Sequence, residues 1–242
     1  MKNNYKINSF ENDEALSDAL CERIVSDLSA GIEKNGRAYL AVSGGNTPKK
    51  VFEKLSKSDL FWTKVIVTLV DERWVKPNDL KSNEKLVKEH LLQNKARTAL
   101  FIPLKNVEIT AKDGEKITRN RLKSIKNFDV VILGMGDDAH TASFFPHPKS
   151  TSSLALTAHA KELDTAFNTQ EFCCATTATV EPLERMTLSR GFLLSTKNLI
   201  LHIEGKKKKE VFDLACASDD MYEKPIISMM QQEKPILEVY YA

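Results

Sequence analysis

The sequence predicts an α/β domain of three layers, in which helices cover both faces of a mostly parallel sheet. Apolar runs rich in Val and Ile alternate along the chain with segments of helical periodicity, and this alternation is typical of α/β folds. The runs are apolar almost throughout, as in parallel strands that are buried on both faces. No Gly/Ser linker, repeat or low-complexity segment divides the 242 residues, so residues 1–242 are expected to form a single domain.

The first half of the chain shows this alternation clearly. A helix is expected over 13–35, where apolar residues recur at helical spacing and a glycine follows. The apolar run 37–43 predicts a buried strand, and the Asn-Thr-Pro of 46–48 opens the next helix, with Pro in its first turn. The Val-rich run 64–71 predicts a second strand. Residues 82–92 predict a helix whose first serine is its cap.

The second half of the chain continues the pattern. A basic amphipathic helix is expected over 112–126, and the run FDVVILG at 128–134 predicts the strand that follows it. The other expected strands are 172–178, 198–204 and 235–241, and the other expected helices are 206–217 and 225–231.

Composition excludes several classes of protein. The net charge of +2 gives no overall attraction to nucleic acid or acidic membranes, and no apolar run approaches the roughly 18 residues of a spanning helix. The N-terminal stretch has no apolar core and does not resemble a signal peptide. We expect a cytoplasmic protein, monomeric or weakly dimeric, without nucleic-acid or membrane partners. The cysteines form no C-x-x-C pair and are expected to be buried free thiols: Cys21, Cys173, Cys174 and Cys216.

Three polar loops follow predicted strands and are the main indication of function. They are SGGNTP at 43–48, DERWV at 71–75 and GMGDDAHTAS at 134–143. Ligands of parallel α/β sheets bind at the carboxyl ends of the strands. We therefore expect these loops to line one edge of the sheet and to form the site.

The first loop, Ser43-Gly44-Gly45-Asn46-Thr47, has the composition of an anion-binding loop. Glycines let backbone N–H groups approach an anion closely, and the N-terminus of the helix that follows favours negative charge. A tight strand-to-helix turn without a ligand is the alternative interpretation.

Basic residues further along the chain are candidates to contact the same anion. The run EGKKKKEVF at 204–212 places like charges at a helix N-terminus, and an anion would relieve that conflict. Arg185 is expected just before a helix capped by Thr187, where its guanidinium could make a two-pronged contact with a phosphate. A solvated helix face or a nonspecific basic patch is the alternative interpretation of the Lys run.

His140 is the strongest candidate for acid–base chemistry. It stands two residues after Asp138 in the third loop, and imidazole suits general-base catalysis near neutral pH. Asp138 could orient its ring, although Asp137 or Asp138 could instead cap a short helix that follows. Of the other histidines, His90 and His159 are expected to be structural, His147 beside two prolines to be exposed, and His202 within an apolar strand to lie in the core. No second His/Cys cluster completes a metal-binding pattern, so no metal is expected.

The same loop also allows a nicotinamide-cofactor interpretation. The pattern Gly134-x-Gly136-x-x-Ala139 after a strand fits the loose dinucleotide fingerprint. However, Pro146 and Pro148 would end any following helix early. No clear strand ending in Asp or Glu lies about 20 residues further on, where the fingerprint needs one. We therefore expect no cofactor.

Several segments, taken in order, resemble those of the 6-phosphogluconolactonases. They are AVSGGNTPKKVFEKL, LVDERWV, SNEKLVKEHLL, GMGDDAHTASFFP, ERMTLS and EGKKKKEVF. DERWV and DAHTASFFP are the most specific, and the resemblance runs from about residue 10 to the C-terminus. It implies a Rossmann-like fold, shared with glucosamine-6-phosphate deaminases and ribose-5-phosphate isomerases. It also implies cofactor-free hydrolysis of 6-phospho-D-glucono-1,5-lactone to 6-phosphogluconate in the pentose-phosphate pathway.

The resemblance further implies roles for individual residues. His140 would be the base that activates water, Asp138 would position it, and Arg73 would contact the lactone or the substrate anion. The family's usual Gly between the Asp and the His is Ala139 here, and a positive φ at this position would strain the backbone. The substrate-binding residues implied are Ser43, Gly44, Gly45, Asn46, Thr47, Asp71, Arg185 and Lys208.

Two other functions fit parts of the sequence. A related deaminase would carry a proton-transferring Glu at the position of Phe145, and usually Tyr at the position of Arg73. A non-catalytic sugar-phosphate sensor would need an attached DNA-binding segment, and the first ~10 residues are too few to form one. The Lys run lacks the interleaved aromatics and the overall basic charge of a nucleic-acid site.

Overall fold

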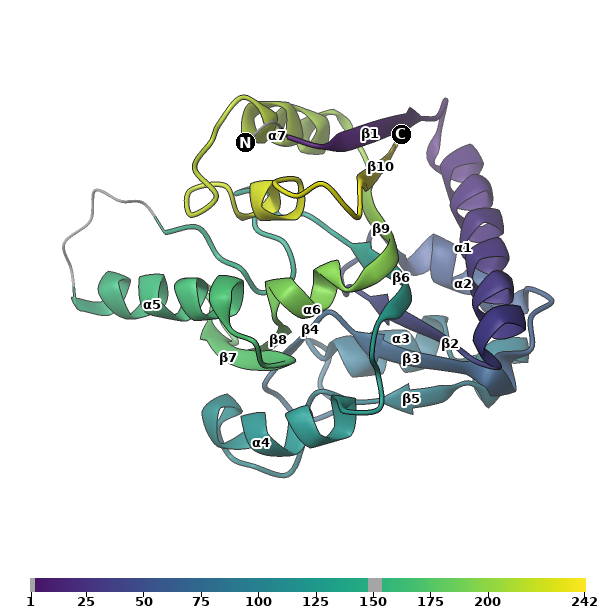
Figure 1. Ribbon diagram of the computed structural model, residues 1–242, viewed down its shortest axis with the longest axis horizontal. Coiled ribbons are helices and arrows are strands. Elements are labelled where there is room, and N and C mark those ends of the chain that lie inside the picture. Colours follow the sequence, from purple (N-terminus) through teal and green to yellow (C-terminus); the bar gives the residue numbers. More distant parts are fainter. Residues whose placement is uncertain (1–2, 148–153) are drawn as a thin grey trace.

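A computed structural model describes residues 3–147 and 154–242 of the chain. Its main element is a parallel sheet of seven strands, which follow one another from β1 at the top of Figure 1 to β5 at the bottom. In spatial order these are β1 (Tyr5–Ser9), β10 (Leu237–Tyr241), β9 (Thr196–Ile203), β6 (Phe128–Leu133), β2 (Ala38–Val42), β3 (Val65–Leu69) and β5 (Leu100–Ile102). A small antiparallel sheet consists of β4 (Asp71–Arg73), β8 (Glu184–Leu188) and β7 (Cys173–Thr177).

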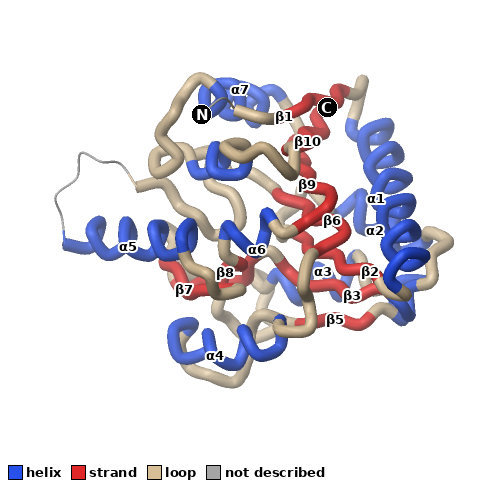
Figure 2. The backbone as a smooth tube through the Cα atoms, in the orientation of Figure 1, coloured by secondary structure: helices blue, strands red, loops and turns tan. Residues whose placement is uncertain are grey.

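Helices cover both sides of the parallel sheet (Figures 1 and 2). The helices are α1 (Asp13–Asn35), α2 (Lys49–Lys57), α3 (Asn83–His90), α4 (Ala111–Leu122), α5 (Leu154–Asn168), α6 (Arg190–Leu194) and α7 (Lys206–Cys216). Short 3₁₀ helices are η1 (Trp62–Lys64), η2 (Asn94–Thr98) and η3 (Pro225–Met229). Helix α1 packs along β2 and β6 on one side, and α6 contacts β9 while α4 and α5 pack on the small sheet. The predicted fold class, a three-layer α/β protein with a mostly parallel sheet, is confirmed.

Local sequence signals account for several helix ends. The side chain of Asn12 accepts hydrogen bonds from the backbone N–H groups of Glu14 and Ala15 at the start of α1. Gly36 ends the same helix in the left-handed conformation, with φ of 75°. Ser82 caps α3 as the sequence predicts, because its hydroxyl accepts the N–H of Lys85 at 3.2 Å.

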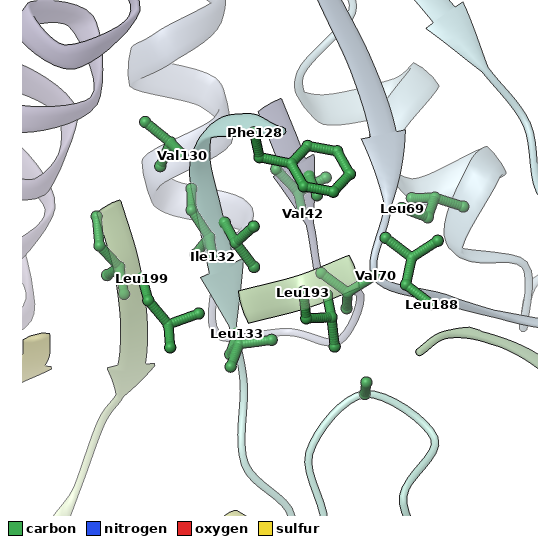
Figure 3. Packing of buried hydrophobic residues seen from close by; sticks show 14 of the residues in the cluster. Val42, Leu69, Val70, Phe128, Val130, Ile132, Leu133, Leu188, Leu193 and Leu199 are labelled. Atoms are coloured by element: carbon green, nitrogen blue, oxygen red, sulfur yellow. The ribbon is translucent and has the colours of Figure 1, made fainter. Parts of the chain in front are cut away.

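The core lies between the central strands and the helices that cover them. The strands β2, β3 and β6 are buried along almost their whole length, which explains why their sequences are apolar runs rather than alternating patterns. Figure 3 shows part of this core, with side chains of the neighbouring strands β2, β6 and β9, among them Val42, Ile132 and Leu199, together with Leu193 of α6.

The segment ERMTLS differs from the helix start expected there. Residues 184–188 form strand β8 and not the approach to a helix, and Thr187 pairs with Asp71 on one side and Cys174 on the other. The cap of α6 is Ser189, whose hydroxyl accepts the N–H of Phe192 at 3.3 Å. Pairing with two neighbouring strands outweighs the local capping signal of Thr187.

Other expected elements also differ. The predicted strand 172–178 is β7, but it lies in the small antiparallel sheet. Residues 225–229 form a 3₁₀ helix where 225–231 was expected to be an α-helix. No helix is present in residues 134–147, so the aspartates of this loop cap no helix there; Pro148 lies outside the described residues. The sequence pattern does not predict the strands β1 and β5 or the helix α5.

The remaining general expectations concern thiols and membranes. All four cysteines are free, as expected. Cys173 and Cys174 are buried, whereas Cys21 and Cys216 are partly exposed. Among the described residues, no helix has the length and apolar character needed to cross a membrane.

Candidate active site

A polar pocket opens where the central strands β2, β6 and β9 end, and its volume is about 340 Å³. The loops that follow β2 and β6 meet there, as expected from the sequence. The third expected loop, DERWV at 71–75, also reaches the pocket, but its first three residues form the short strand β4, because they pair with β8 in the small sheet. The start of α7 and residue Asn83 of α3 complete the lining. Of the residues singled out in the sequence, those that line the pocket are Ser43, Gly44, Gly45, Asn46, Thr47, Asp71, Arg73, His140 and Lys208.

The loop 43–48 needs its two glycines for different reasons. Gly45 has a φ of 99°, in the region that favours glycine. At Gly44 a Cβ atom would come within 1.9 Å of the Oδ1 atom of Asn83, so a side chain has no room there. The loop therefore brings main-chain N–H groups to the pocket without side chains in the way, just before α2 begins. This geometry is suited to binding an anion.

Asp71 is held rigidly at the floor of the pocket. It is buried, and its Oδ2 atom accepts a hydrogen bond of 2.6 Å from the hydroxyl of Ser143. The side-chain amide of Asn83 donates to the Asp71 carbonyl at 2.9 Å. Arg73, two residues further on, donates from Nη1 to the carbonyl of Lys81 at 2.7 Å. The pocket thus contains a fixed carboxylate and a guanidinium that is braced on one side.

His140 and Asp138 form a close pair at one side of the pocket. The Nδ1 atom of His140 lies 2.6 Å from Oδ1 of Asp138, and the same oxygen accepts the backbone N–H of His140 at 3.1 Å. Partial burial raises the pKa of Asp138, but the hydrogen bond and the charge of His140 outweigh burial and hold it below its ordinary value. Because Asp138 occupies Nδ1, the Nε2 atom is the imidazole nitrogen left for a reacting group.

The backbone around this pair is tightly constrained. A Cβ atom at Gly136 would come within 2.1 Å of Nδ1 of His140, so the close approach requires glycine. Ala139 is fully buried with a φ of 66°, and its carbonyl accepts the N–H of Ile226 at 3.0 Å. The position between Asp138 and His140 therefore has a positive φ, which strains the backbone of an alanine.

Lys208 reaches the pocket from the first turn of α7. Its Nζ atom donates to the carbonyl of Met135 at 2.8 Å and lies 2.6 Å from Oδ1 of Asp137. Gly205 precedes the helix with a φ of 83°. Lys208 therefore connects α7 with the loop that carries His140.

Arg185 is not among the described residues that line the pocket. It lies in β8 opposite Arg73, is buried, and donates to the carbonyls of Pro182 and Glu184. Burial lowers its pKa, and its guanidinium lies 5.9 Å from the ring centre of Phe145. These backbone contacts use the Nη1 atom of the guanidinium.

Sequence reasoning misses three residues of the site. The sequence pattern identifies Asn83 only as the start of a helix and Ser143 only as the end of a motif. Their hydrogen bonds with Asp71 join different elements of the fold, so no local pattern predicts them. His202 is buried in β9, as expected, but it also lines the pocket, with Nε2 at 3.0 Å from Oε1 of Glu204. Its position one residue before the end of a strand is the signal that could have found it.

The described residues contain no group of three or more His, Cys, Asp or Glu side chains that could hold a metal ion. The groups that the described residues bring to the pocket are the imidazole of His140, paired with the Asp138 carboxylate, the Arg73 guanidinium, the Lys208 ammonium and main-chain N–H groups.

A parallel α/β sheet with a glycine loop and an Asp–His pair at the carboxyl ends of its strands is the arrangement of an enzyme that acts on a small molecule. Comparison with known proteins makes this more specific. Residues 11–237 match the family described as glucosamine-6-phosphate isomerases/6-phosphogluconolactonase. The chain belongs to this family.

Similar proteins share almost the whole chain. The 6-phosphogluconolactonase of Rhizobium meliloti (strain 1021) is 42% identical over 234 residues, 96% of this chain and 97% of that protein. The 6-phosphogluconolactonase of Neisseria meningitidis serogroup B is 34% identical over 96% of this chain and 97% of its own length. A crystal structure of a 6-phosphogluconolactonase from Shewanella baltica OS155 has a TM-score of 0.91 at 39% identity and covers 98% of this chain and 97% of its own. The family predicted from the sequence motifs is confirmed.

Proposed function

We propose that this chain hydrolyses 6-phospho-D-glucono-1,5-lactone to 6-phosphogluconate, as a cytoplasmic enzyme of the oxidative pentose-phosphate pathway. The observation that carries this proposal is that His140, paired with Asp138, lines the same pocket as the loop 43–48 and Lys208. The pocket thus combines groups suited to a phosphate with a group suited to proton transfer. The names of the similar proteins support the same activity.

In the proposed mechanism, Nε2 of His140 takes a proton from a water molecule as the water oxygen attacks C1 of the lactone. Asp138 keeps the proton of the imidazole on Nδ1 and stabilises the charged ring. The negative charge that develops on the carbonyl oxygen would be stabilised by Arg73 and loop N–H groups. The tetrahedral intermediate then breaks its bond to the ring oxygen, which takes the proton back from His140. The carboxylic acid product ionises and releases one proton to solution.

Binding of the phosphate would orient the ring for this attack. The loop 43–47 and Lys208 line the pocket and would hold the phosphate, so that binding energy from a non-reacting group positions C1. Asp71 is fixed by Ser143 and Asn83 and would accept a hydrogen bond from a sugar hydroxyl. Arg185 would contact the phosphate through N–H groups of its guanidinium that do not hold the backbone carbonyls of Pro182 and Glu184.

The proposal is tested by proton release from freshly made 6-phosphogluconolactone, compared with its spontaneous hydrolysis. We expect His140→Ala to lower kcat by at least about 100-fold, because general-base catalysis contributes roughly 10²–10⁴-fold. Binding of 6-phosphogluconate, measured by calorimetry, should change little. An unchanged kcat in this variant would refute the role of His140, and a wild-type rate equal to the spontaneous one would refute the activity.

Deamination of glucosamine 6-phosphate is the competing function on this fold. Phe145 packs against His140, with 5.0 Å between the ring centres, and an apolar ring cannot transfer protons. We expect no ammonia release from glucosamine 6-phosphate. Measurable release would favour the deaminase. Tight binding of the phosphogluconate without turnover of the lactone would favour a non-catalytic sensor.

A further inference from the structure

The carboxylate of Asp137 lies between two lysines of α7. Its Oδ1 atom is 2.6 Å from Nζ of Lys208, and its Oδ2 atom pairs with Nζ of Lys207. These two ion pairs connect the loop that carries His140 with the start of α7, about 70 positions further along the chain. The ion pairs with Lys207 and Lys208 lower the pKa of Asp137 to about 2, so the carboxylate is charged at any physiological pH.

The two lysines differ in their relation to the pocket. Lys208 lines it, with 26% of its side chain exposed and its Nζ also held by the carbonyl of Met135. Lys207 is 73% exposed and is not among the described lining residues. Any phosphate that reaches Lys208 therefore meets an ammonium whose charge is already shared with Asp137, because opposite charges at this distance attract each other.

We propose that Asp137 sets the phosphate affinity of the pocket by competing with the substrate phosphate for Lys208, and that Lys207 relieves this competition by offering Asp137 a second partner. When phosphate takes the Lys208 ammonium, Asp137 keeps its ion pair with Lys207 and is not left unpaired. Asp137 is thus a positioning residue, because it acts on the substrate through Lys208. The inference rests on the proposed function in one respect, the phosphate contact of Lys208.

The arrangement also connects phosphate binding with the reacting end of the site. Asp137 directly precedes Asp138, and the carbonyl of Met135 that holds Lys208 belongs to the same loop. A phosphate that draws Lys208 toward itself would therefore pull on the segment that positions His140. The competition is a property of the Asp137–Lys207–Lys208 cluster and does not depend on the acid–base step.

The test measures binding of inorganic phosphate and of 6-phosphogluconate by calorimetry in low salt, with no turnover required. We expect Asp137→Asn to tighten both by about 2- to 5-fold, the range of an exposed ion pair, and Lys207→Met to weaken both by a similar factor. Two variants change the net charge equally on the same helix and serve as controls. Glu210→Gln matches the loss of a negative charge, and Lys206→Met the loss of a positive one, since these residues pair with each other at 3.8 Å.

The decisive comparison is made in the Asp137→Asn background. In that background Lys207→Met and Lys206→Met should weaken phosphate binding equally, because the ion pair between Lys207 and the residue 137 carboxylate no longer exists. The inference is overturned if Asp137→Asn binds phosphate no tighter than Glu210→Gln, or if Lys207→Met keeps its larger effect without Asp137. Failure of the wild-type chain to bind phosphate would also overturn it. Phosphate binding without lactone hydrolysis would refute only the proposed function. Thermal melts of each variant check that the fold is retained.

Discussion

At the scale of single residues, Ala139 shows most clearly how the site constrains the chain. Its φ of 66° lies in the left-handed region, which costs an L-residue roughly 1–2 kcal/mol. Glycine would avoid this cost, but it would lose a buried methyl group worth about 0.8 kcal/mol and would add about 0.5–1 kcal/mol of backbone entropy. The opposing contributions nearly cancel, which explains how alanine is tolerated at this position.

This balance predicts different results for two substitutions. Ala139→Gly should change the free energy of unfolding by less than about 1 kcal/mol and leave kcat within a few-fold of wild type. Ala139→Val should lose at least about 2 kcal/mol, because a β-branched side chain is strained at positive φ and the site has no spare volume. It should also lower kcat by displacing His140. Urea unfolding and steady-state kinetics measure both effects, and a Val variant as stable as wild type would contradict the argument.

At the scale of elements, the contact between β4 and α3 depends on the buried carboxylate of Glu72. It accepts the N–H groups of Asn83 and Glu84 at 2.7 Å each and the hydroxyl of Ser82 at 3.1 Å, so a strand residue caps the helix. Burial raises the pKa of Glu72 to about 7, against the lowering effect of these backbone N–H groups. The site residues Asp71 and Arg73 flank Glu72, and the cap therefore holds them near α3.

The raised pKa predicts how stability depends on pH. The folded state keeps the proton of Glu72 up to about pH 7, whereas the unfolded chain loses it near the ordinary value of 4.5. Between these values the unfolded state binds fewer protons, so this group makes stability fall as pH rises, by at most roughly 3 kcal/mol. The penalty is complete above about pH 7 and absent below 4.5.

Glu72→Gln removes this titration. Its unfolding free energy relative to wild type should rise between pH 4.5 and 7, as measured by urea unfolding at several pH values. The value about one pH unit below 4.5, where wild-type Glu72 is largely protonated in both states, gives the cost of the amide itself and serves as the control. Parallel stability curves for the two proteins would contradict the prediction.

At the scale of the whole molecule, the two ends of the chain meet at one edge of the parallel sheet (Figure 1). Strand β1 pairs in parallel with β10, from Tyr5 opposite Leu237 to Ser9 opposite Tyr241. The ring of Tyr5 packs edge-on against Phe212 of α7, with 5.3 Å between the ring centres. β1 thus covers the edge of β10 and supports the helix that carries Lys208.

Deletion of residues 1–9 tests this role of β1. We expect a loss of at least about 2 kcal/mol, because the apolar contacts of Tyr5 and Ile7 are removed. The uncovered edge of β10 should also promote self-association. Urea unfolding and size-exclusion chromatography measure the two effects. Lys6→Ala, in the same strand and exposed, is the control and should resemble wild type; a truncated chain with unchanged midpoint and elution would refute the prediction.

The sequence by itself determined those features that depend on neighbouring residues. Continuous apolar runs identify the central strands, Ser82 caps its helix, and the glycine loop and the Asp138–His140 pair stand at strand ends. The family motifs follow from the same local patterns. The glycine loop and the Asp138–His140 pair come together only in the folded chain. The location of the pocket could nevertheless be predicted, because the carboxyl ends of parallel strands lie at one edge of the sheet.

The tertiary structure alone decided which distant side chains meet. The structure shows that strand pairing places Arg185, a predicted phosphate ligand, where it also donates to backbone carbonyls. Asn83 and Ser143 fix Asp71, and Asp137 pairs with Lys207 and Lys208, across long separations in the sequence. A local pattern contains the conformational preference of a segment but no record of its partners, because those contacts depend on how the layers pack.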